Sequence, residues 1–285
     1  MPNPQIHDSM LRNYLNDEAN MLTICNALCN TDCRNPTEIV FTTSDGTFFS
    51  NLKNDLACLF LNHFLILAEY QTTINENMPL RMLMYLVEQI KQYLTDKRRL
   101  IYRNPILHLP RVHCVVLYSG KAKEKDYRIM RLSDAFCGYE FAPELLVEVY
   151  NINYGSRNKL IDNSLPLQHY ARFIHRIRNN QANGMSQDNA IREAAQYCKT
   201  NGIMAEYLTA KEKEVFDMLG FEWNEDEAHA AYFEDGMQQG MQQGRIATWV
   251  NAIRNLSAKQ GITSVTAMDI LDIPATDRPA IIAAL

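Results

Sequence analysis

The sequence predicts a mixed α/β domain followed by a helical region. Two apolar runs of strand length, 54–61 and 64–71, are separated only by Asn62 and His63, which favours a β-hairpin. Further strand-like runs lie on both sides of a helical stretch, and beyond about residue 160 the apolar spacing is helical throughout. The resulting order, α-β-β-β-α-β with one more strand, is typical of a mixed sheet covered by helices.

The elements of the first part follow from local patterns. Apolar residues recur at helical spacing from His7 to about Asn30, and a short strand at 38–43 is stopped by the turn Ser44-Asp45-Gly46. After the hairpin, Asn77 is a candidate N-cap with Pro79 in the first turn, and apolar spacing carries this helix to about Leu94. Two further strands are expected, at 112–118 before Ser119-Gly120 and at 145–152 before Tyr154-Gly155.

The second half predicts amphipathic helices at 167–179, 186–200 and 204–219. A perfect repeat with glycines at 236, 240 and 244 follows, and two small helices at about 246–260 and 265–285 close the chain. On a helix the repeat makes a stripe of small residues, but each interior glycine costs about 1 kcal/mol, so a flexible linker is an equal alternative. We therefore expect three parts: a core at 1–160, a helical extension at 161–235, and a repeat with a small helical module at 236–285.

Composition limits the class of protein. Hydrophobic residues make up 47% and charged residues 21%, as in globular proteins. The seven cysteines include no Cys-x-x-Cys pair and the first residues show no signal-peptide pattern, so we expect a cytoplasmic protein. The longest apolar stretch, 56–68, is broken by Asn62-His63 and is shorter than the roughly 20 residues that span a bilayer, so no membrane partner is expected.

Charge is unevenly distributed along the chain. The net charge is −5, yet residues 81–131 hold 12 Lys and Arg against 4 Asp and Glu, whereas residues 204–236 hold 2 against 10. This asymmetry suggests a face for phosphates and a separate acidic segment. Two ordinary solvated surfaces are the alternative.

The strongest chemical signal is the open end of the hairpin, where Asp55 comes near Glu69 and Gln71. Two carboxylates and the backbone carbonyl of Tyr70 could hold a hard divalent cation such as Mg²⁺. Glu69 and Gln71 share one face of a strand while the Tyr70 side chain points away. Asp55 joins that face only if the turn has an odd length or the strand has a bulge. The alternative to a metal site is that both acids are polar strand-end residues in solvent.

Arg81 and Tyr85 lie one helical turn apart directly after the hairpin, so they share a face that can reach the same cleft. Arg81 could bind a phosphate with two hydrogen bonds. A solvated arginine beside a core tyrosine is the alternative.

Three further patterns have simpler explanations. Cys25, Cys29 and Cys33 follow at intervals of four, which is conceivable for zinc but fits small buried residues on a packing face better. Tyr118-Ser119 fits the end of a strand rather than a covalent nucleophile. The two terminal helices could form a DNA-binding helix-turn-helix, but their few basic residues favour an oligomerisation or capping role.

Several segments together resemble a known family. They are Asn54-Asp55-Leu56, Leu67-Ala-Glu69-Tyr-Gln71-Thr72, Asn77-Met-Pro-Leu-Arg81-Met-Leu-Met-Tyr85, Val115-Val-Leu-Tyr-Ser-Gly120, Leu132-Ser-Asp-Ala-Phe136 and Val149-Tyr-Asn-Ile-Asn-Tyr-Gly155. With the late helices and glycine repeat, the chain is similar over most of 8–245 to the PD-(D/E)XK nuclease family transposases, the YhgA-like or recombination-promoting nuclease group.

The resemblance implies a restriction-endonuclease-like core, DNA as partner, and DNA cleavage that depends on Mg²⁺ or Mn²⁺. Asp55 and Glu69 fall on the family's metal-binding acids, and Gln71 falls where the wider superfamily has lysine. Gln71 can orient water but supplies no charge, and Asn54 replaces the usual proline. We therefore expect a metal-dependent endodeoxyribonuclease with catalytic Asp55, Glu69 and Gln71, supported by Arg81 and Tyr85. A DNA-binding or assembly scaffold without catalysis is the alternative, and an accessory factor that acts through the acidic segment is a third.

Overall fold

The computed structural model describes residues 10–42, 56–95, 97–137, 142–274 and 277–285. It divides into two compact units, residues 1–222 and 223–285. The first unit holds a six-stranded mixed sheet with helices, and the C-terminal part is mostly helical, so the predicted α/β class is confirmed. Asp55 lies outside the described residues.

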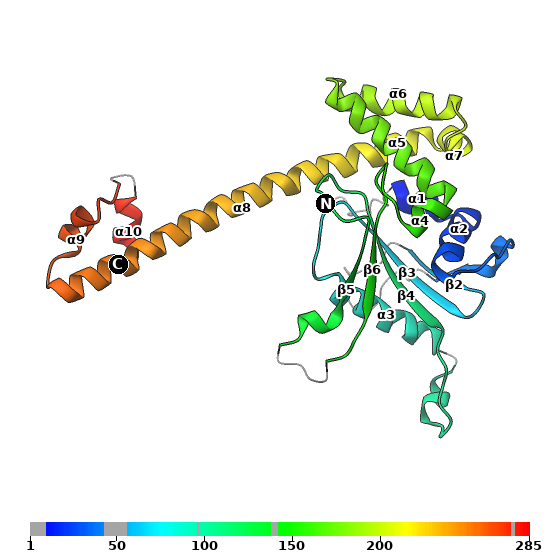
Figure 1. Ribbon diagram of the computed structural model, residues 1–285, viewed down its shortest axis with the longest axis horizontal. Helices are drawn as coiled ribbons and strands as arrows, with labels where there is room; N and C mark the ends of the chain where they lie inside the picture. Colours follow the sequence, from blue (N-terminus) through cyan, green and yellow to red (C-terminus); the bar gives the residue numbers. More distant parts are fainter. Residues whose placement is uncertain (1–9, 43–55, 96, 138–141, 275–276) are drawn as a thin grey trace, which may run out of the picture. The chain divides into compact units, whose positions relative to one another are not determined.

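The sheet runs in the order β1-β2-β3-β4-β6-β5 (Figure 1). Its strands are β1 (Ile39–Phe41), β2 (Leu56–Phe60), β3 (Phe64–Gln71), β4 (Arg111–Tyr118), β5 (Tyr127–Arg131) and β6 (Leu146–Asn151). The first three strands form an antiparallel meander, β3, β4 and β6 are mutually parallel, and β5 is an antiparallel edge. The carboxyl ends of the three parallel strands therefore lie at the same end of the sheet.

The edge strand β5 was not predicted. Its five residues are Tyr-Arg-Ile-Met-Arg, and only Met130 among them is buried. Tyr127 and Ile129 are 41% and 44% exposed, so the strand lacks the clear apolar face that periodicity detects. Pairing with β6 over five residues holds it in place.

The hairpin is confirmed, with a turn of three residues. Phe60 pairs with Phe64, so Leu61, Asn62 and His63 form the connection, and Leu61 leaves the strand to which it was assigned. Leu61 and Asn62 both have φ of 53°, an uncommon conformation for residues other than glycine. The turn is held by the Leu61 amide, which donates to the Glu38 carbonyl at 3.1 Å. Its odd length matters for the site below.

Helix α3 (Met78–Tyr93) covers one face of the sheet. Its buried residues pack with residues of five strands in one apolar cluster, Ala57, Leu65, Leu67, Met78, Met82, Tyr85, Cys114, Val116, Tyr118, Met130, Val147 and Val149. Pro79 lies in the first turn as predicted, but the side chain of Asn77 makes no capping hydrogen bond. The Asn75 side chain instead accepts from the Asn77 amide at 2.9 Å, so this helix begins from a preceding turn.

The opposite face packs against the N-terminal helices and the start of the helical region. These helices are α1 (Met10–Leu15), α2 (Glu18–Cys29), α4 (Lys159–Asn163) and α5 (Leu165–Ala182). Cys25 of α2 approaches Cys58 of β2, with 3.8 Å between the sulfur atoms. The single helix expected at 7–30 is divided because the Asp17 side chain accepts from the Asn20 amide at 2.9 Å and begins a new helix.

Glu148 of β6 is a mostly buried acid on this opposite face. His113 lies 3.5 Å from it, the Tyr150 hydroxyl donates to it at 2.5 Å, and Lys159 lies 3.5 Å away. Burial opposes its ionisation, but the hydrogen bonds from His113 and Tyr150 and the charge of Lys159 lower its pKa to about 2. His113 is therefore a partly buried partner of a carboxylate.

The remaining helices are α6 (Gln187–Thr200), α7 (Ala205–Ala210), α8 (Glu212–Gln260), α9 (Ser264–Ile270) and α10 (Arg278–Ala284), with short 3₁₀ turns at Pro36–Glu38, Arg98–Tyr102 and Leu132–Ala135. Helices α5, α6 and α7 pack beside one another (Figure 1). The predicted helix at 204–219 is split at Lys211, and the glycine repeat is helical within α8. The second unit has its own apolar cluster, Val250, Ile253, Ala267, Met268, Ile273 and Ile281. In the described part of the chain, none of the helices combines the length and the hydropathy needed to span a membrane.

Candidate functional site

Four of the predicted site residues meet where β3 ends and α3 begins. Glu69 is only 2% exposed, and its Oε1 atom forms an ion pair with Arg81. The Tyr85 hydroxyl lies 3.4 Å from the same oxygen, and Gln71 Nε2 also lies 3.4 Å from it. Arg81 in turn donates to the Tyr85 hydroxyl from Nη2 at 2.9 Å and from Nε at 3.3 Å. We call Glu69, Gln71, Arg81 and Tyr85 the Glu69 cluster.

Simple periodicities bring this cluster together. Glu69 and Gln71 continue the face of β3 that carries Leu65 and Leu67, which pack against α3. Arg81 and Tyr85 are four residues apart and share the face of α3 that meets them. Tyr70 points to the opposite face, where the Tyr170 hydroxyl donates to its hydroxyl at 3.1 Å.

Arg81 acts as the counter-ion of a buried carboxylate. The Glu69 side chain is 3% exposed and the Arg81 side chain 29%, so the acid is desolvated while the guanidinium still reaches solvent. A desolvated carboxylate needs such a partner, because its charge would otherwise be strongly unfavourable. Sequence reasoning had placed both residues near one cleft but had not paired them.

The end of β3 provides some of the oxygen ligands that a hard cation requires. Gln71 accepts from the Ser119 amide at 3.0 Å through its carbonyl, so the carbonyl of Tyr70, one residue earlier, points to the β2 side of the strand. The Glu69 carboxylate and the Tyr70 carbonyl are ligand types that Mg²⁺ accepts while it keeps several waters. Across the described ranges no three His, Cys, Asp or Glu side chains are grouped to hold a metal, and Asp55 is outside those ranges.

The cysteine trio does not form a metal site in the described part of the chain. Cys25 and Cys29 lie on α2, whereas Cys33 follows the end of that helix, and Asn30 intervenes with φ of 56°. Cys25 is fully buried in the contact between α2 and β2. The packing interpretation is therefore confirmed for Cys25 alone, because Cys29 is only partly buried and Cys33 lies beyond the helix.

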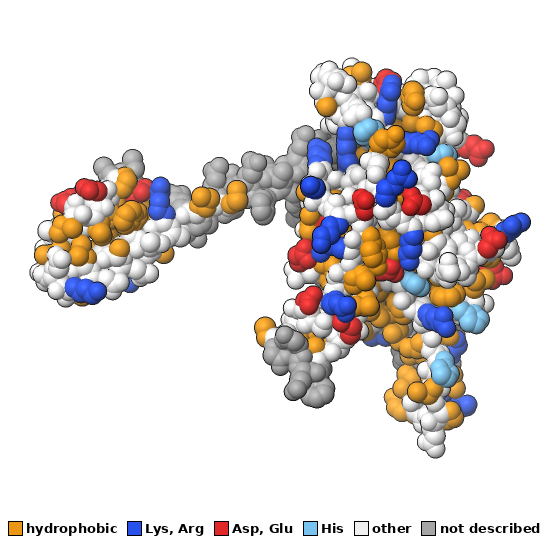
Figure 2. All heavy atoms as spheres, viewed as in Figure 1, with side chains coloured by type: hydrophobic (Ala, Val, Ile, Leu, Met, Phe, Trp, Pro, Cys, Tyr) orange, Lys and Arg blue, Asp and Glu red, His pale blue; other side chains and the backbone are white. Residues whose placement is uncertain are grey.

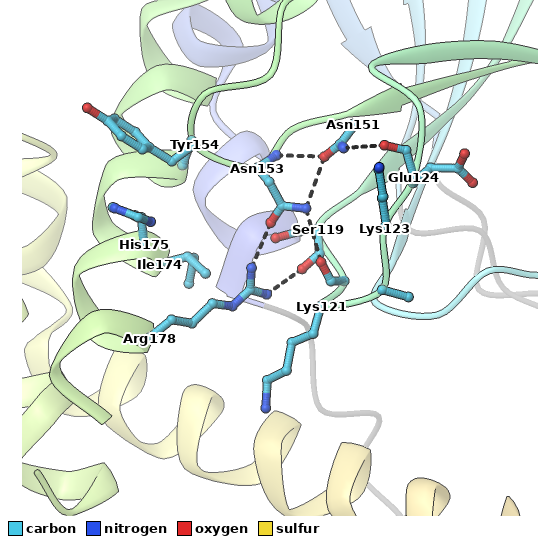
Figure 3. A pocket seen from close by; sticks show the side chains of 13 residues that line it. Ser119, Lys121, Lys123, Glu124, Asn151, Asn153, Tyr154, Ile174, His175 and Arg178 are labelled. Atoms are coloured by element: carbon cyan, nitrogen blue, oxygen red, sulfur yellow. Dashed lines mark hydrogen bonds between the residues drawn. The ribbon is translucent and has the colours of Figure 1, made fainter. Parts of the chain in front are cut away.

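A second polar site lies where β4 and β6 end, and sequence reasoning missed it. A cavity of about 380 Å³ is bounded by the segment 119–124 after β4, the segment 151–154 after β6, and one side of α5. Figure 3 shows Arg178 reaching from α5 toward Asn153 and Ser119. We call this cavity the strand-end pocket. Ligands commonly bind at the carboxyl ends of parallel strands, and that rule could have pointed to the two polar turns.

Hydrogen bonds fix the walls of the strand-end pocket. Arg178 donates from Nη1 to Asn153 Oδ1 at 2.6 Å and from Nη2 to the Ser119 carbonyl. Asn153 Nδ2 donates to the Gly120 carbonyl at 3.0 Å, which ties the two segments together. A side chain at Gly120 would meet the Thr72 carbonyl at 1.9 Å, so only glycine fits there. These contacts therefore fix the shape of the pocket.

Several basic residues of the described part of 81–131 are paired with acids. Lys and Arg side chains are interspersed with Asp and Glu over the face drawn in Figure 2. Arg128 pairs with Glu76 and Glu124, both at 3.1 Å, and Arg131 pairs with Glu144 at 3.1 Å. Lys121 and Lys123, by contrast, line the strand-end pocket and have no carboxylate within 4.0 Å among the residues the structure describes.

Comparison with known proteins adds no relative to this description. No family model matches the chain, no curated protein is significantly similar to it, and no solved structure matches its fold.

Proposed function

We propose that this protein is a metal-dependent DNA endonuclease that hydrolyses phosphodiester bonds, with the Glu69 cluster as part of its catalytic centre. The observation that carries the proposal is a buried carboxylate, 2% exposed, at the end of a central strand. Gln71, Arg81 and Tyr85 all gather around one of its oxygens. Buried acids with gathered polar partners at strand ends are typical of functional sites.

The order of elements supports the same proposal. Helix α2, the meander β1-β2-β3, helix α3 and the parallel strand β4 follow one another as α-β-β-β-α-β. This is the order that the resemblance to the PD-(D/E)XK nucleases implies for a restriction-endonuclease-like core. We extend the proposal to that core, and β6 and β5 then enlarge its sheet.

Asp55 is the second proposed metal ligand. The described register ends at Leu56 opposite Ala68, and the three-residue turn gives it the odd length that a same-face site requires. Asp55 itself lies outside the described residues, and its role is proposed from the resemblance, in which it falls on a metal-binding acid. Asp55, Glu69 and the Tyr70 carbonyl would then hold Mg²⁺ or Mn²⁺.

Each residue of the cluster has a distinct proposed role. A bound divalent cation would lower the pKa of a coordinated water and stabilise charge on the phosphate during in-line displacement. Gln71 would orient the attacking water by hydrogen bonds without adding charge. Arg81 would balance the Glu69 charge and support the phosphate, and Tyr85 would fix the direction of Arg81 through its hydroxyl.

Plasmid cleavage tests this function. Purified protein is incubated with supercoiled plasmid in Mg²⁺, Mn²⁺ or EDTA, beside Asp55→Ala, Glu69→Gln and a control, Glu88→Gln. Glu88 lies on α3 and pairs with Lys91 at 2.7 Å, so its change removes a carboxylate outside the cluster. We expect metal-dependent nicking that both site variants lose and the control keeps. Absence of cleavage, or equal cleavage by all variants, would refute the proposal.

A scaffold without catalysis is the second candidate. The observation that favours it is the Glu69–Arg81 ion pair, which neutralises the buried acid without a metal, together with Gln71, which supplies no charge. Calorimetric titration of the unaltered protein and of Glu69→Gln with Mn²⁺ distinguishes the nuclease from the scaffold. Binding that Glu69→Gln abolishes supports the nuclease, and no binding to either protein supports the scaffold.

We also propose that the second unit makes a contact between copies of the chain. Val265, Ile270 and Ile282 on α9 and α10 are each between 55% and 58% exposed. Apolar side chains exposed together on a small unit favour association. Light scattering of the full chain and of a triple serine variant at these positions tests this contact; a mass equal to one chain in the unaltered protein contradicts it.

A further inference from the structure

We propose that the strand-end pocket binds the phosphate and base of one nucleotide, either free or as a unit of a single strand. This binding is separate from the proposed cleavage, because no residue of the Glu69 cluster lines the pocket. Nucleotide binding at this pocket can therefore be tested independently of any activity at Glu69. Size, charge and ring contacts of the pocket carry the inference.

The size suits a small ligand. Sites for small molecules and cofactors have volumes of roughly 300 to 1,000 Å³. The strand-end pocket, at about 380 Å³, lies at the lower end of that range. It also lies at the carboxyl edge of the parallel strands β4 and β6, where ligands of α/β sheets commonly bind.

The charge of the lining suits a phosphate. Arg178, Lys121 and Lys123 line the pocket, and in the described structure none of them has a carboxylate within 4.0 Å. The acid in the lining, Glu124, is paired with Arg128 at 3.1 Å, and Figure 3 shows its carboxylate turned away from Arg178. A concave site with unbalanced positive charge attracts and holds an anion.

Arg178 has hydrogen-bonding capacity left for such an anion. Its two known bonds go to the neutral oxygens of Asn153 and Ser119, which fix the plane of the guanidinium. Its Nε atom is buried and has no hydrogen-bond partner among the described residues. A guanidinium has five N–H donors and pairs well with phosphate, so the geometry leaves donors for a ligand oxygen.

The rim of the pocket offers a ring for a base. Tyr154 and His175 are stacked, with their ring centroids 4.4 Å apart and their planes 20° apart. Tyr154 is 56% exposed, and Figure 3 shows this pair at the edge of the pocket beside Ile174. Exposed aromatic rings beside positive charge are the usual combination for binding single nucleotides or single strands, because every base can stack.

Calorimetry in EDTA tests the inference with the full chain. The probes are thymidine 5′-monophosphate, thymidine, inorganic phosphate and a short oligothymidylate. We expect the monophosphate or the oligothymidylate to bind, thymidine and phosphate alone to bind more weakly, and Glu69→Gln to leave this binding unchanged. A monophosphate that binds identifies the free nucleotide, whereas binding of the oligothymidylate alone identifies the strand as the source; both outcomes support the pocket.

Variants locate the binding. Lys123→Gln should weaken it roughly threefold, whereas Lys125→Gln, an exposed lysine of the same loop outside the lining, should leave it unchanged. Tyr154→Ala should weaken the nucleotide about tenfold but not phosphate. Arg178→Gln should weaken the binding of both nucleotide and phosphate about tenfold or more. If that variant fails to fold, the variants at the exposed residues Lys123 and Tyr154 still test the inference.

Two results would overturn the inference. One is that neither the monophosphate nor the oligothymidylate binds the unaltered protein. The other is that Lys123→Gln and Lys125→Gln weaken binding equally, since a general surface attraction would then explain it.

Discussion

Replacing Arg81 with methionine should destabilise the first unit much more than replacing Glu69 with glutamine. The Glu69 side chain is 3% exposed, so Arg81→Met leaves a buried carboxylate without its cation. Such a loss costs about 3 to 5 kcal/mol. Glu69→Gln should cost only about 1 to 2 kcal/mol, because the Arg81 side chain is 29% exposed and can be hydrated. The double variant should be more stable than Arg81→Met alone.

Urea unfolding followed by near-ultraviolet circular dichroism is the suitable assay. Thirteen of the 14 tyrosines lie in residues 1–222, whereas both tryptophans lie in the second unit, so tyrosine signals report the unit that contains the pair. Arg172→Met, an exposed arginine of α5, is the control and should change stability by less than about 0.5 kcal/mol. If Arg81→Met costs no more than Glu69→Gln, or if the two changes are simply additive, the buried ion pair does not have the role assigned to it.

Three other outcomes follow from the structure. Glu148→Gln should remove a contribution to the free energy of unfolding that depends on pH. In the unaltered protein the Glu148 pKa is lowered to about 2, so its carboxylate stabilises the folded state above pH 4.5. In acid unfolding experiments the unaltered protein should lose about 2 kcal/mol of stability relative to the variant as the pH falls toward 2. Gly120→Ala should lower the free energy of unfolding by about 2 kcal/mol or more in urea titrations, because its Cβ would meet a carbonyl at 1.9 Å. Gly244→Ala should raise the free energy of unfolding by about 0.5 to 1 kcal/mol, because Gly244 lies in a helix and its Cβ would meet open space. Burial raises the pKa of the Cys114 thiol to about 12, so a thiol reagent read by mass spectrometry should label the exposed Cys137 first, and rapid labelling of Cys114 in the folded protein would contradict its placement.

Local patterns were sufficient for much of the fold. The apolar runs around Asn62 and His63 predicted the hairpin, and the period of two placed Glu69 and Gln71 on one face with Tyr70 on the other. The spacing of four predicted that Arg81 and Tyr85 share a face of α3. These predictions succeeded because periodicity is a property of the backbone over a few residues, and neighbouring side chains are enough to reveal it.

Helix boundaries were less accurate. The sequence showed one helix at 7–30, but Asp17 accepts a hydrogen bond from the Asn20 amide and starts a second helix. Asn77 was expected to cap α3, yet Asn75 supplies the side-chain contact. Residues with short polar side chains compete to cap a helix, and spacing alone does not decide which of them wins.

The sequence by itself therefore determined the α/β class, most strands and helices, and the face on which Glu69, Gln71, Arg81 and Tyr85 lie. Only the tertiary structure decided that Arg81 neutralises Glu69 across 12 residues, and that Ser119, Asn153 and Arg178 meet in one pocket. It also decided the odd turn, which sets the register of the whole hairpin. The physical reason is range: a period needs only a few residues, whereas a contact between distant residues depends on how strands align and helices pack.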